Sequence, residues 1–299
     1  MNIAITGASG FIGRRLLKIL AKDGHKLHVL SRHAGTNLPN GVRLSVWDAM
    51  KGPPPLDALR DATAVIHLAG EPVAQRWTAD AKRRIRDSRV LGTRHLVAAL
   101  EQLPQRAEVL LSASAIGYYG SRGDEILTED SPPGAGFLSE VCAAWEKEAA
   151  AAEALGVRVT RLRVGMVLDP RGGALQRMLP PFRLGLGGKL GSGSQWTSWI
   201  HLEDLAALFR FALDRPAGAV LNAVAPNPVT NSHFTRELSA ALRRPAIFPV
   251  PALALRAIFG DMAEVLLASQ RVVPQAAQAA GFQFRFPQLA GALANLLRK

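Results

Sequence analysis

The first residues with clear chemical potential are three glycines, Gly7, Gly10 and Gly13, which follow a short apolar stretch at the start of the chain. Glycine allows a tight turn, and a backbone without side chains lets a pyrophosphate approach closely. A helical pattern over 11–23 follows, so the unpaired N–H groups of its first turn and its positive dipole end would face the phosphates. This placement between a strand and a helix predicts a dinucleotide-binding loop. The residues expected to contact the dinucleotide are Gly7, Ser9, Gly10, Phe11, Ile12 and Gly13.

The end of the second expected strand indicates which dinucleotide would bind. In nucleotide-binding units of this kind, an acidic residue at this point accepts hydrogen bonds from the adenosine ribose. Here the strand ends in Ser31, Arg32 and His33, with no carboxylate. Because an arginine can grip a 2′-phosphate with two hydrogen bonds, we expect NADP rather than NAD, with these three residues close to the phosphate. The alternative is that Arg32 is an ordinary surface residue at a strand end.

Two further strand ends would complete the adenosine site. Asp48 follows the third expected strand, where its carboxylate would bond the adenine amino group. His67, Leu68, Ala69 and Gly70 end the fourth strand and would form a wall of the adenosine pocket. His67 has a second interpretation, as a buried structural histidine.

Strands alternate with helical patterns over the first half of the chain, which predicts an α/β fold with a doubly wound parallel sheet. We expect a cofactor-binding domain over 1–165, to which 199–225 return, and a substrate-facing segment with a smaller α/β domain over 166–299. Residues 170–198 are rich in Gly, Pro and Arg and are expected to be irregular. The expected strands are 2–6, 26–31, 42–46, 63–68, 108–113, 158–163 and 219–224. The expected helices are 11–23, 56–60, 79–102, 138–155, 231–242, 252–267 and 287–298.

The order of motifs along the chain resembles that of the extended short-chain dehydrogenase/reductase superfamily, of the NAD-dependent epimerase/dehydratase type. A narrower similarity is to an atypical branch labelled epimerase-family proteins, which ends in a small domain of unknown function. The resemblance implies a Rossmann-like fold, NADP binding and a place for Arg163 among the cofactor-binding residues, but no defined reaction. The residues that carry it are 6–13, 67–77, 112–120, 162–163, 172–175, 195–204 and, in the tail, 259–274.

The usual catalytic residues of that superfamily are only partly matched. Its chemistry uses a tyrosine with a lysine four residues later, a serine that holds the substrate oxygen, and a supporting asparagine. Ser114 stands where the serine belongs, but residues 137–142 contain neither tyrosine nor lysine, and Arg89 replaces the asparagine. Without a nearby cation a phenol keeps a pKa of about 10, which is too high for an efficient base at neutral pH.

Three functions are compatible with these residues. In the first, the chain is an NADP-dependent oxidoreductase or epimerase for a small polar, nucleotide-sugar-like substrate. Ser114 would orient the substrate oxygen, Tyr118 or Tyr119 would transfer the proton, and Arg89 would hold an anionic group. The alternatives are packing for the tyrosines and a structural ion pair for Arg89. In the second, the chain senses NADP(H) without turnover, since the phosphate loop is kept and the Tyr–Lys pair is lost. In the third, a basic surface recruits nucleic acid or a membrane.

Charge and composition disfavour the third function. The net charge of the 299 residues is +12, but the cations are scattered apart from a cluster at 82–86, which has no aromatic platform for bases beside it. No apolar run approaches the roughly 20 residues that span a bilayer. We therefore expect no nucleic-acid or membrane partner. Cys142 is the only cysteine, and no His, Asp or Glu spacing suggests a metal site.

The remaining expectations concern the substrate and the setting. Arg177, Arg183 and Lys189 lie in the segment expected to face the substrate, which favours an anionic small molecule. The first strand begins directly after Met1, leaving no room for a signal peptide, so we expect a cytoplasmic protein. The two long helices at 79–102 and 138–155 would suit a homodimer interface, although a monomer is equally compatible.

Overall fold

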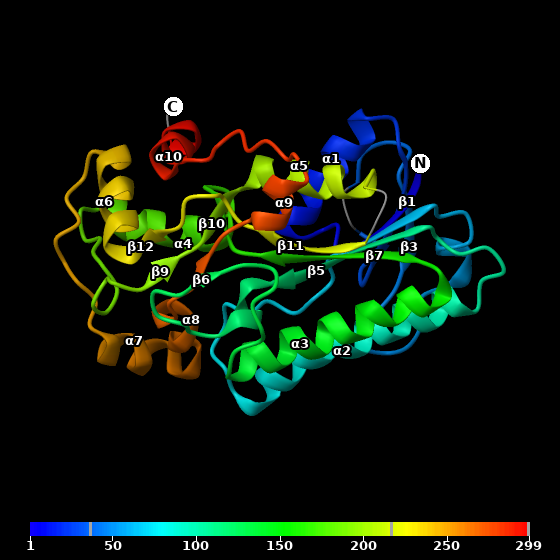
Figure 1. Cartoon of the computed structure of the whole chain (residues 1–299), viewed down its shortest axis with the longest axis horizontal. Coiled ribbons are helices and arrows are strands. Elements are labelled where there is room, and N and C mark those ends of the chain that lie inside the picture. Colours follow the sequence, from blue (N-terminus) through cyan, green and yellow to red (C-terminus); the bar gives the residue numbers. More distant parts are fainter. Residues whose placement is uncertain (36–37, 216–217, 298–299) are drawn as a thin grey trace.

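A computed structural model describes residues 1–35, 38–215 and 218–297, and its centre is a seven-stranded sheet (Figure 1). The strands lie in the order β11-β7-β5-β4-β1-β2-β3, and every neighbouring pair is parallel. The order changes direction between β1 and β4, the position at which ligands bind in open sheets of this kind. The predicted doubly wound, Rossmann-like fold is therefore confirmed. The strands are β1 (Asn2–Thr6), β2 (Lys26–Ser31), β3 (Arg43–Val46), β4 (Ala64–His67), β5 (Val109–Ala115), β7 (Arg158–Val164) and β11 (Ala219–Ala223).

Helices cover both faces of the sheet, as Figure 1 shows. On one face lie α1 (Phe11–Lys22) and α5 (Leu202–Leu213), which pack against each other. On the other lie α2 (Ala79–Glu101) and α3 (Phe137–Ala150), which also form a pair. Two apolar clusters fill the spaces between the sheet and these layers. Because strands covered on both faces are apolar almost throughout, runs such as β4 were recognisable from the sequence.

The expectation of an irregular segment at 170–198 is wrong for its first part, which forms α4 (Gly173–Arg183). Pro180 and Pro181 lie inside this helix, and their presence suggested a loop. Leu175, Leu179 and Phe182 share one face of α4 and are buried, so tertiary packing outweighs the cost of the prolines.

A second, smaller unit follows β11, and its helices α6 (Asn231–Leu242) and α10 (Leu289–Leu297) pack in one apolar cluster with α4. The apolar helix expected over 252–267 is interrupted at Gly260, where φ is +59°, giving α7 (Ala252–Phe259) and α8 (Ala263–Leu267). The last expected helix is present as α10, while residue 298 lies outside the described residues.

Short elements connect the two units. Residues 271–272 pair with 126–127 in parallel, and 229–230 pair with 196–197 antiparallel, so each ladder joins a strand after β11 to one before it. A third short ladder, between 199–201 and 166–168, lies within the part that precedes β11. No helix among the described residues is long and apolar enough to cross a membrane. The short elements are β6 (Ile126–Leu127), β8 (Met166–Asp169), β9 (Trp196–Thr197), β10 (Trp199–His201), β12 (Val229–Thr230), β13 (Arg271–Val272) and α9 (Gln275–Ala279), with 3-10 turns at Leu56–Ala58, Ile116–Tyr119, Ala151–Leu155 and Gly260–Met262.

Candidate active site

The glycine loop between β1 and α1 brings several backbone segments unusually close together. Gly7 has φ of +69°, and a Cβ there would lie 2.7 Å from the carbonyl carbon of Leu68. A Cβ on Gly13 would lie 2.5 Å from the carbonyl oxygen of Gly7 and 2.6 Å from Cα of Ala8. Only glycine fits at these two positions, because the opposing atoms are backbone.

The start of α1 offers donors to an anion. Gly10 is the N-cap and provides no side-chain cap, and the first turn contains no acidic residue. Ser9 is exposed, while the ring of Phe11 packs against the backbone at Gly172, where an added Cβ would lie 2.3 Å from the ring. The unpaired N–H groups and the helix dipole fit the pyrophosphate of a dinucleotide.

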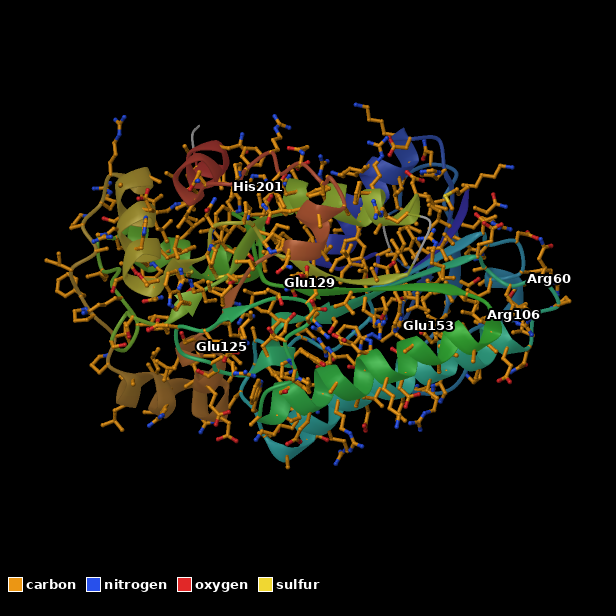
Figure 2. All side chains as sticks on the ribbon, in the orientation of Figure 1. Arg60, Arg106, Glu125, Glu129, Glu153 and His201 are labelled. Atoms are coloured by element: carbon orange, nitrogen blue, oxygen red, sulfur yellow. The ribbon has the colours of Figure 1, made fainter. Side chains whose placement is uncertain are left out.

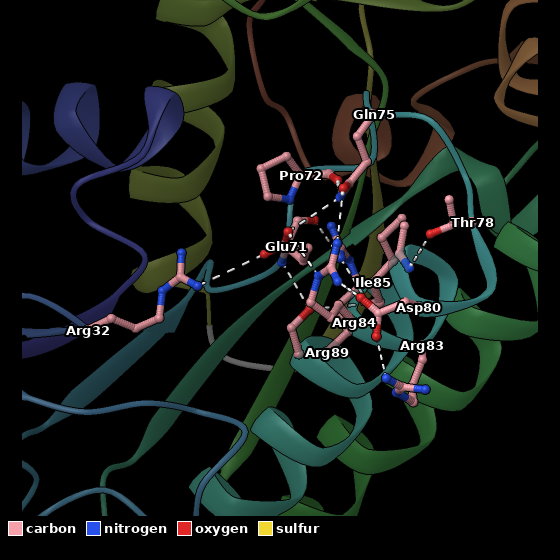
Figure 3. A network of polar contacts seen from close by, with 12 residues as sticks. Arg32, Glu71, Pro72, Gln75, Thr78, Asp80, Arg83, Arg84, Ile85 and Arg89 are labelled. Carbon is pink, nitrogen blue, oxygen red and sulfur yellow. Dashed lines mark hydrogen bonds and ion pairs between the residues drawn. The ribbon is translucent and has the colours of Figure 1, made fainter. Parts of the chain in front are cut away.

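Arg32 lies just beyond β2 with its side chain 56% exposed, and its guanidinium lies 3.9 Å from a carboxylate oxygen of Glu71 (Figure 3). Since β1 lies between β2 and β4, this ion pair spans the end of β1. Beside it, the backbone N–H of His33 donates to the hydroxyl of Ser31. Asp48 accepts a hydrogen bond from the N–H of Met50 within its own loop. The roles predicted for these residues toward a cofactor stay predictions.

Glu71 is a residue of the site to which the sequence analysis assigned no role. Its backbone is fixed twice: its N–H donates to Ser88 Oγ (2.9 Å), and its carbonyl accepts from Arg89 Nη1 (2.9 Å). Its carboxylate lies between Arg32 and Arg84, the latter at 3.7 Å (Figure 3). The sequence feature that could have identified Glu71 is its position directly after 67–70, the run expected to border the adenosine pocket.

His67 holds the end of β4 against the glycine loop. Thr6 Oγ1 accepts hydrogen bonds from the N–H groups of Leu68 and Ala69, so its own proton is donated to His67 Nδ1 at 2.7 Å. The proton of neutral His67 is then on Nε2, which donates to Thr93 Oγ1 at 3.0 Å. Burial, assisted by the charge of Arg89, lowers the pKa of His67 to about 4. These contacts support the structural interpretation of His67.

Ser114, near the carboxyl end of β5, belongs to a buried network of polar side chains. Its hydroxyl donates to Glu146 Oε1 at 2.6 Å, and Glu146 receives two hydrogen bonds from Arg163, at 2.8 and 2.9 Å. The side chains of Glu146 and Arg163 are only 7% and 4% exposed. Arg163 therefore lies inside this network, whereas the family resemblance implied contact with the cofactor.

The same network holds Tyr119, which is fully buried. Its hydroxyl donates to Asn222 Oδ1 and accepts from Arg163 Nη1, and burial raises its pKa to about 12. Glu129, near the middle of the molecule in Figure 2, closes the network by accepting the N–H of Asn222. Tyr119 thus has the packing role that was its alternative. Tyr118 is only half-buried, and its ring lies 3.5 Å from the guanidinium of Arg163.

Arg89 makes hydrogen bonds to the backbone of the segment that follows β4 and to the backbone of α2. Its guanidinium donates to the carbonyls of Glu71 and Ile85 and lies against Gly70, where an added Cβ would be 3.0 Å away. Burial lowers its pKa. The structure therefore assigns Arg89 structural contacts, and its predicted binding of an anionic group stays a prediction.

Two apolar side chains lie at the start of α3, within the range 137–142 where a Tyr–Lys pair is expected. Phe137, at the start of α3, makes an edge-to-face contact with Trp77 at 5.1 Å between ring centroids. Val141, one turn later, is buried. Neither side chain can transfer a proton.

Comparison with known proteins agrees with this architecture. The profile of the NAD dependent epimerase/dehydratase family matches residues 3–223. The chain belongs to this family. A second profile, a domain of unknown function (DUF1731), matches residues 250–296, which contain α7, α8 and α10.

Relatives within the family cover the whole chain. The Arabidopsis thaliana "Epimerase family protein SDR39U1 homolog, chloroplastic" is 39% identical, over 100% of this chain and 87% of its own length. The crystal structure of human epimerase family protein SDR39U1 (isoform 2) with NADPH superimposes with a TM-score of 0.88 at 35% identity, covering 99% of both chains. A nucleoside-diphosphate sugar epimerase from Corynebacterium glutamicum gives a TM-score of 0.79 at 38% identity, over 99% of this chain and 58% of that chain.

The close packing of the glycine loop leads to a stability prediction. We expect Gly13→Ala to lower the free energy of unfolding by about 1–3 kcal/mol, because the new Cβ would meet backbone atoms that cannot move aside. Gly291 in α10 is the control, since an added Cβ there meets nothing within 4 Å. Gly291→Ala should raise stability by about 0.5–1 kcal/mol. Urea unfolding followed by tryptophan fluorescence measures both, and an unchanged midpoint for Gly13→Ala would contradict the packing argument.

A second prediction concerns pH. The pKa of His67 is about 4 when folded and 6.5 ordinarily, so between these values the unfolded chain binds more protons and stability falls with acidity. As pH falls through this window, the wild type should lose about 3 kcal/mol more unfolding free energy than His67→Gln, whose amide is able to keep both hydrogen bonds. Parallel pH profiles of the two proteins would rule out a buried neutral His67.

Proposed function

We propose that the chain is an NADP(H)-dependent oxidoreductase or epimerase that acts on a small polar, nucleotide-sugar-like substrate. The observation that carries the cofactor assignment is the cation Arg32 at the end of β2, beside an uncapped helix N-terminus and a glycine loop. The human relative with NADPH bound, at 35% identity, supports it. When bound, the nicotinamide supplies a hydride donor or acceptor.

Different groups of the chain would bind different parts of the cofactor. The N–H groups at the start of α1 would receive the pyrophosphate, and Arg32 would pair with the 2′-phosphate. Glu71 is the present partner of Arg32, so binding of a 2′-phosphate exchanges one anion for another on the same guanidinium. A cofactor without that phosphate offers Arg32 no such partner, which favours NADP(H) over NAD(H).

For proton transfer, Tyr118 is the better of the two tyrosines. The hydroxyl of Tyr119 has partners on both sides and no contact with solvent. Tyr118 is half-buried at the carboxyl end of β5. Ser114 already donates its proton to Glu146, so its oxygen would accept a hydrogen bond from a substrate hydroxyl rather than donate one.

The position and the cations of residues 170–198, the segment expected to face the substrate, favour an anionic ligand. Arg177 on α4 donates to the carbonyl of Ala74 at 2.8 Å, which joins α4 to the loop that follows β4. Arg183 and Lys189 are exposed on the same segment.

A second candidate function is an NADP(H) sensor without turnover. It is favoured by the burial of Tyr119 and by the lack of tyrosine and lysine in residues 137–142, the range expected for the proton-transfer pair. Such a protein would keep the cofactor groove and report its occupancy to a partner.

Turnover separates the two candidates. NADPH deuterated at nicotinamide C4 would be incubated with the protein and a small-metabolite extract, and mass spectrometry would search for deuterium in any metabolite. In parallel, the NADP⁺-loaded protein would be given nucleotide sugars and followed by NMR for epimers. A product in either arm, lost in Tyr118→Phe and in boiled protein, supports the enzyme. No product in both, with NADPH binding confirmed, supports the sensor.

The cofactor preference has its own test. Arg32→Ala should weaken NADPH binding about 10- to 100-fold, the loss of a charged hydrogen-bonded pair, and NADH binding by less than about twofold. Arg43→Ala is a matched control, since Arg43 is also an exposed arginine with a carboxylate at 3.9 Å, but it lies on the outer strand. Isothermal titration measures both cofactors, and equal weakening of the two would remove the 2′-phosphate assignment.

A further inference from the structure

Large apolar side chains are exposed together at one end of the molecule, which we name the apolar end. Leu253 is 79% exposed, Leu184 74% and Ile247 73%. Side chains of this size are normally covered in a soluble domain unless the surface serves an interaction. The apolar end consists of Leu184, Leu186, Ile247, Phe248, Leu253 and Ile258, each more than half exposed.

These residues come from separate segments that the backbone joins into one surface. The N–H of Phe248 donates to the carbonyl of Gly187, and the N–H of Val250 donates to that of Lys189. The stretches 184–190 and 245–250 therefore run side by side, and α7 begins directly after them. In Figure 1 the connection from α6 to α7 forms the left extremity of the molecule, away from β1 and α1 on the right.

The two segments that form the apolar end carry only positive charges, and among the described residues the nearest exposed acid without an ion pair along the chain is Glu264 on α8. The sequence contains no acidic residue over 170–202 or over 238–260. The next acid along the chain, Asp261, is paired with Lys82 at 2.6 Å.

Arg171 on the first segment pairs with Asp169, and Arg177 donates to the carbonyl of Ala74. The remaining cations on these segments form no ion pair with any residue in the described ranges. These exposed cations are Arg183, Lys189, Arg243, Arg244 and Arg256.

We propose that the apolar end docks on the surface of an anionic lipid bilayer. Exposed apolar tips beside unpaired cations are the combination that binds such an interface, since the tips enter the boundary between head groups and acyl chains while the cations meet the head groups. The exposed apolar side chains project from short loops and one short helix, an arrangement that suits their insertion into a lipid surface.

The cofactor assignment does not depend on this docking, because no residue of the apolar end is among those assigned to the cofactor, whereas Arg183 and Lys189 are shared with the proposed anionic-substrate segment. The proposed docking also differs from the expectation drawn from the sequence, in which the scattered cations suggested that the protein has no membrane partner. The cations are scattered in sequence and collected in space.

The test is co-sedimentation of the full chain with vesicles of phosphatidylcholine alone or mixed with phosphatidylglycerol, at low and high salt. We expect binding only to the mixed vesicles, reduced by salt. Leu253→Ser with Ile258→Ser should weaken it about tenfold or more, from the loss of two buried apolar side chains. Arg243→Gln with Arg244→Gln and Arg256→Gln should also weaken it.

The matched control is Val46→Ser with Ile126→Ser, two apolar residues that are similarly exposed, at 56% and 55%, outside the apolar end. It should bind vesicles as the wild type does, and all variants should keep NADPH affinity and the unfolding midpoint. Failure to bind the mixed vesicles overturns the proposal. So does binding that the serine pair at 253 and 258 leaves intact, since net charge alone would then explain it. Concentration-dependent self-association that this pair abolishes, without vesicle binding, would indicate a protein interface instead.

Discussion

The ion pair between Glu146 and Arg163 is the constraint on which the centre of the molecule depends. Both charges are almost completely withdrawn from water, and a buried ion pair repays its desolvation only with good geometry and further hydrogen bonds. The fold provides these: two parallel bonds between the side chains, the hydroxyl of Ser114 on one side and that of Tyr119 on the other. One pair therefore fixes α3, β5, β7 and the turn after β5 relative to one another.

This requirement also shapes the chemistry open to the site. A tyrosine needed to satisfy a buried arginine is not free to exchange protons with a substrate, and burial keeps Tyr119 neutral. A serine whose proton is held by a carboxylate can only accept from a ligand. Ser114 and Tyr119 thus serve the interior first, whereas Tyr118 stays half-buried and its hydroxyl has no such hydrogen bonds within the described residues.

The features predictable from sequence were those encoded by neighbouring residues. The glycine loop was recognisable because Gly7, Gly10 and Gly13 lie within seven positions, and β4 because a strand covered on both faces is apolar throughout. The pairing of Ser114 with Glu146 joins residues 32 positions apart, and that of Arg32 with Glu71 joins the ends of two strands. No local pattern reports such contacts. For α4, the local signal of Pro180 and Pro181 pointed the wrong way, because burial of Leu175 and Phe182 decides the outcome.

Charge illustrates the same limit at the scale of the whole surface. Along the sequence, positive residues are dispersed and the cluster at 82–86 is the most conspicuous. In the structure three of the four cations of that cluster are paired, since Asp80 pairs with Arg83 and Arg84, and Asp261 pairs with Lys82. In the part of the chain that the structure describes, exposed cations without an ion pair lie on the two acid-free segments that carry the exposed leucines and isoleucines, and others lie elsewhere on the surface, such as Lys18, Lys22 and Arg60. An ion pair removes a charge from the long-range field, so a surface is basic where acids are missing rather than where arginines are dense.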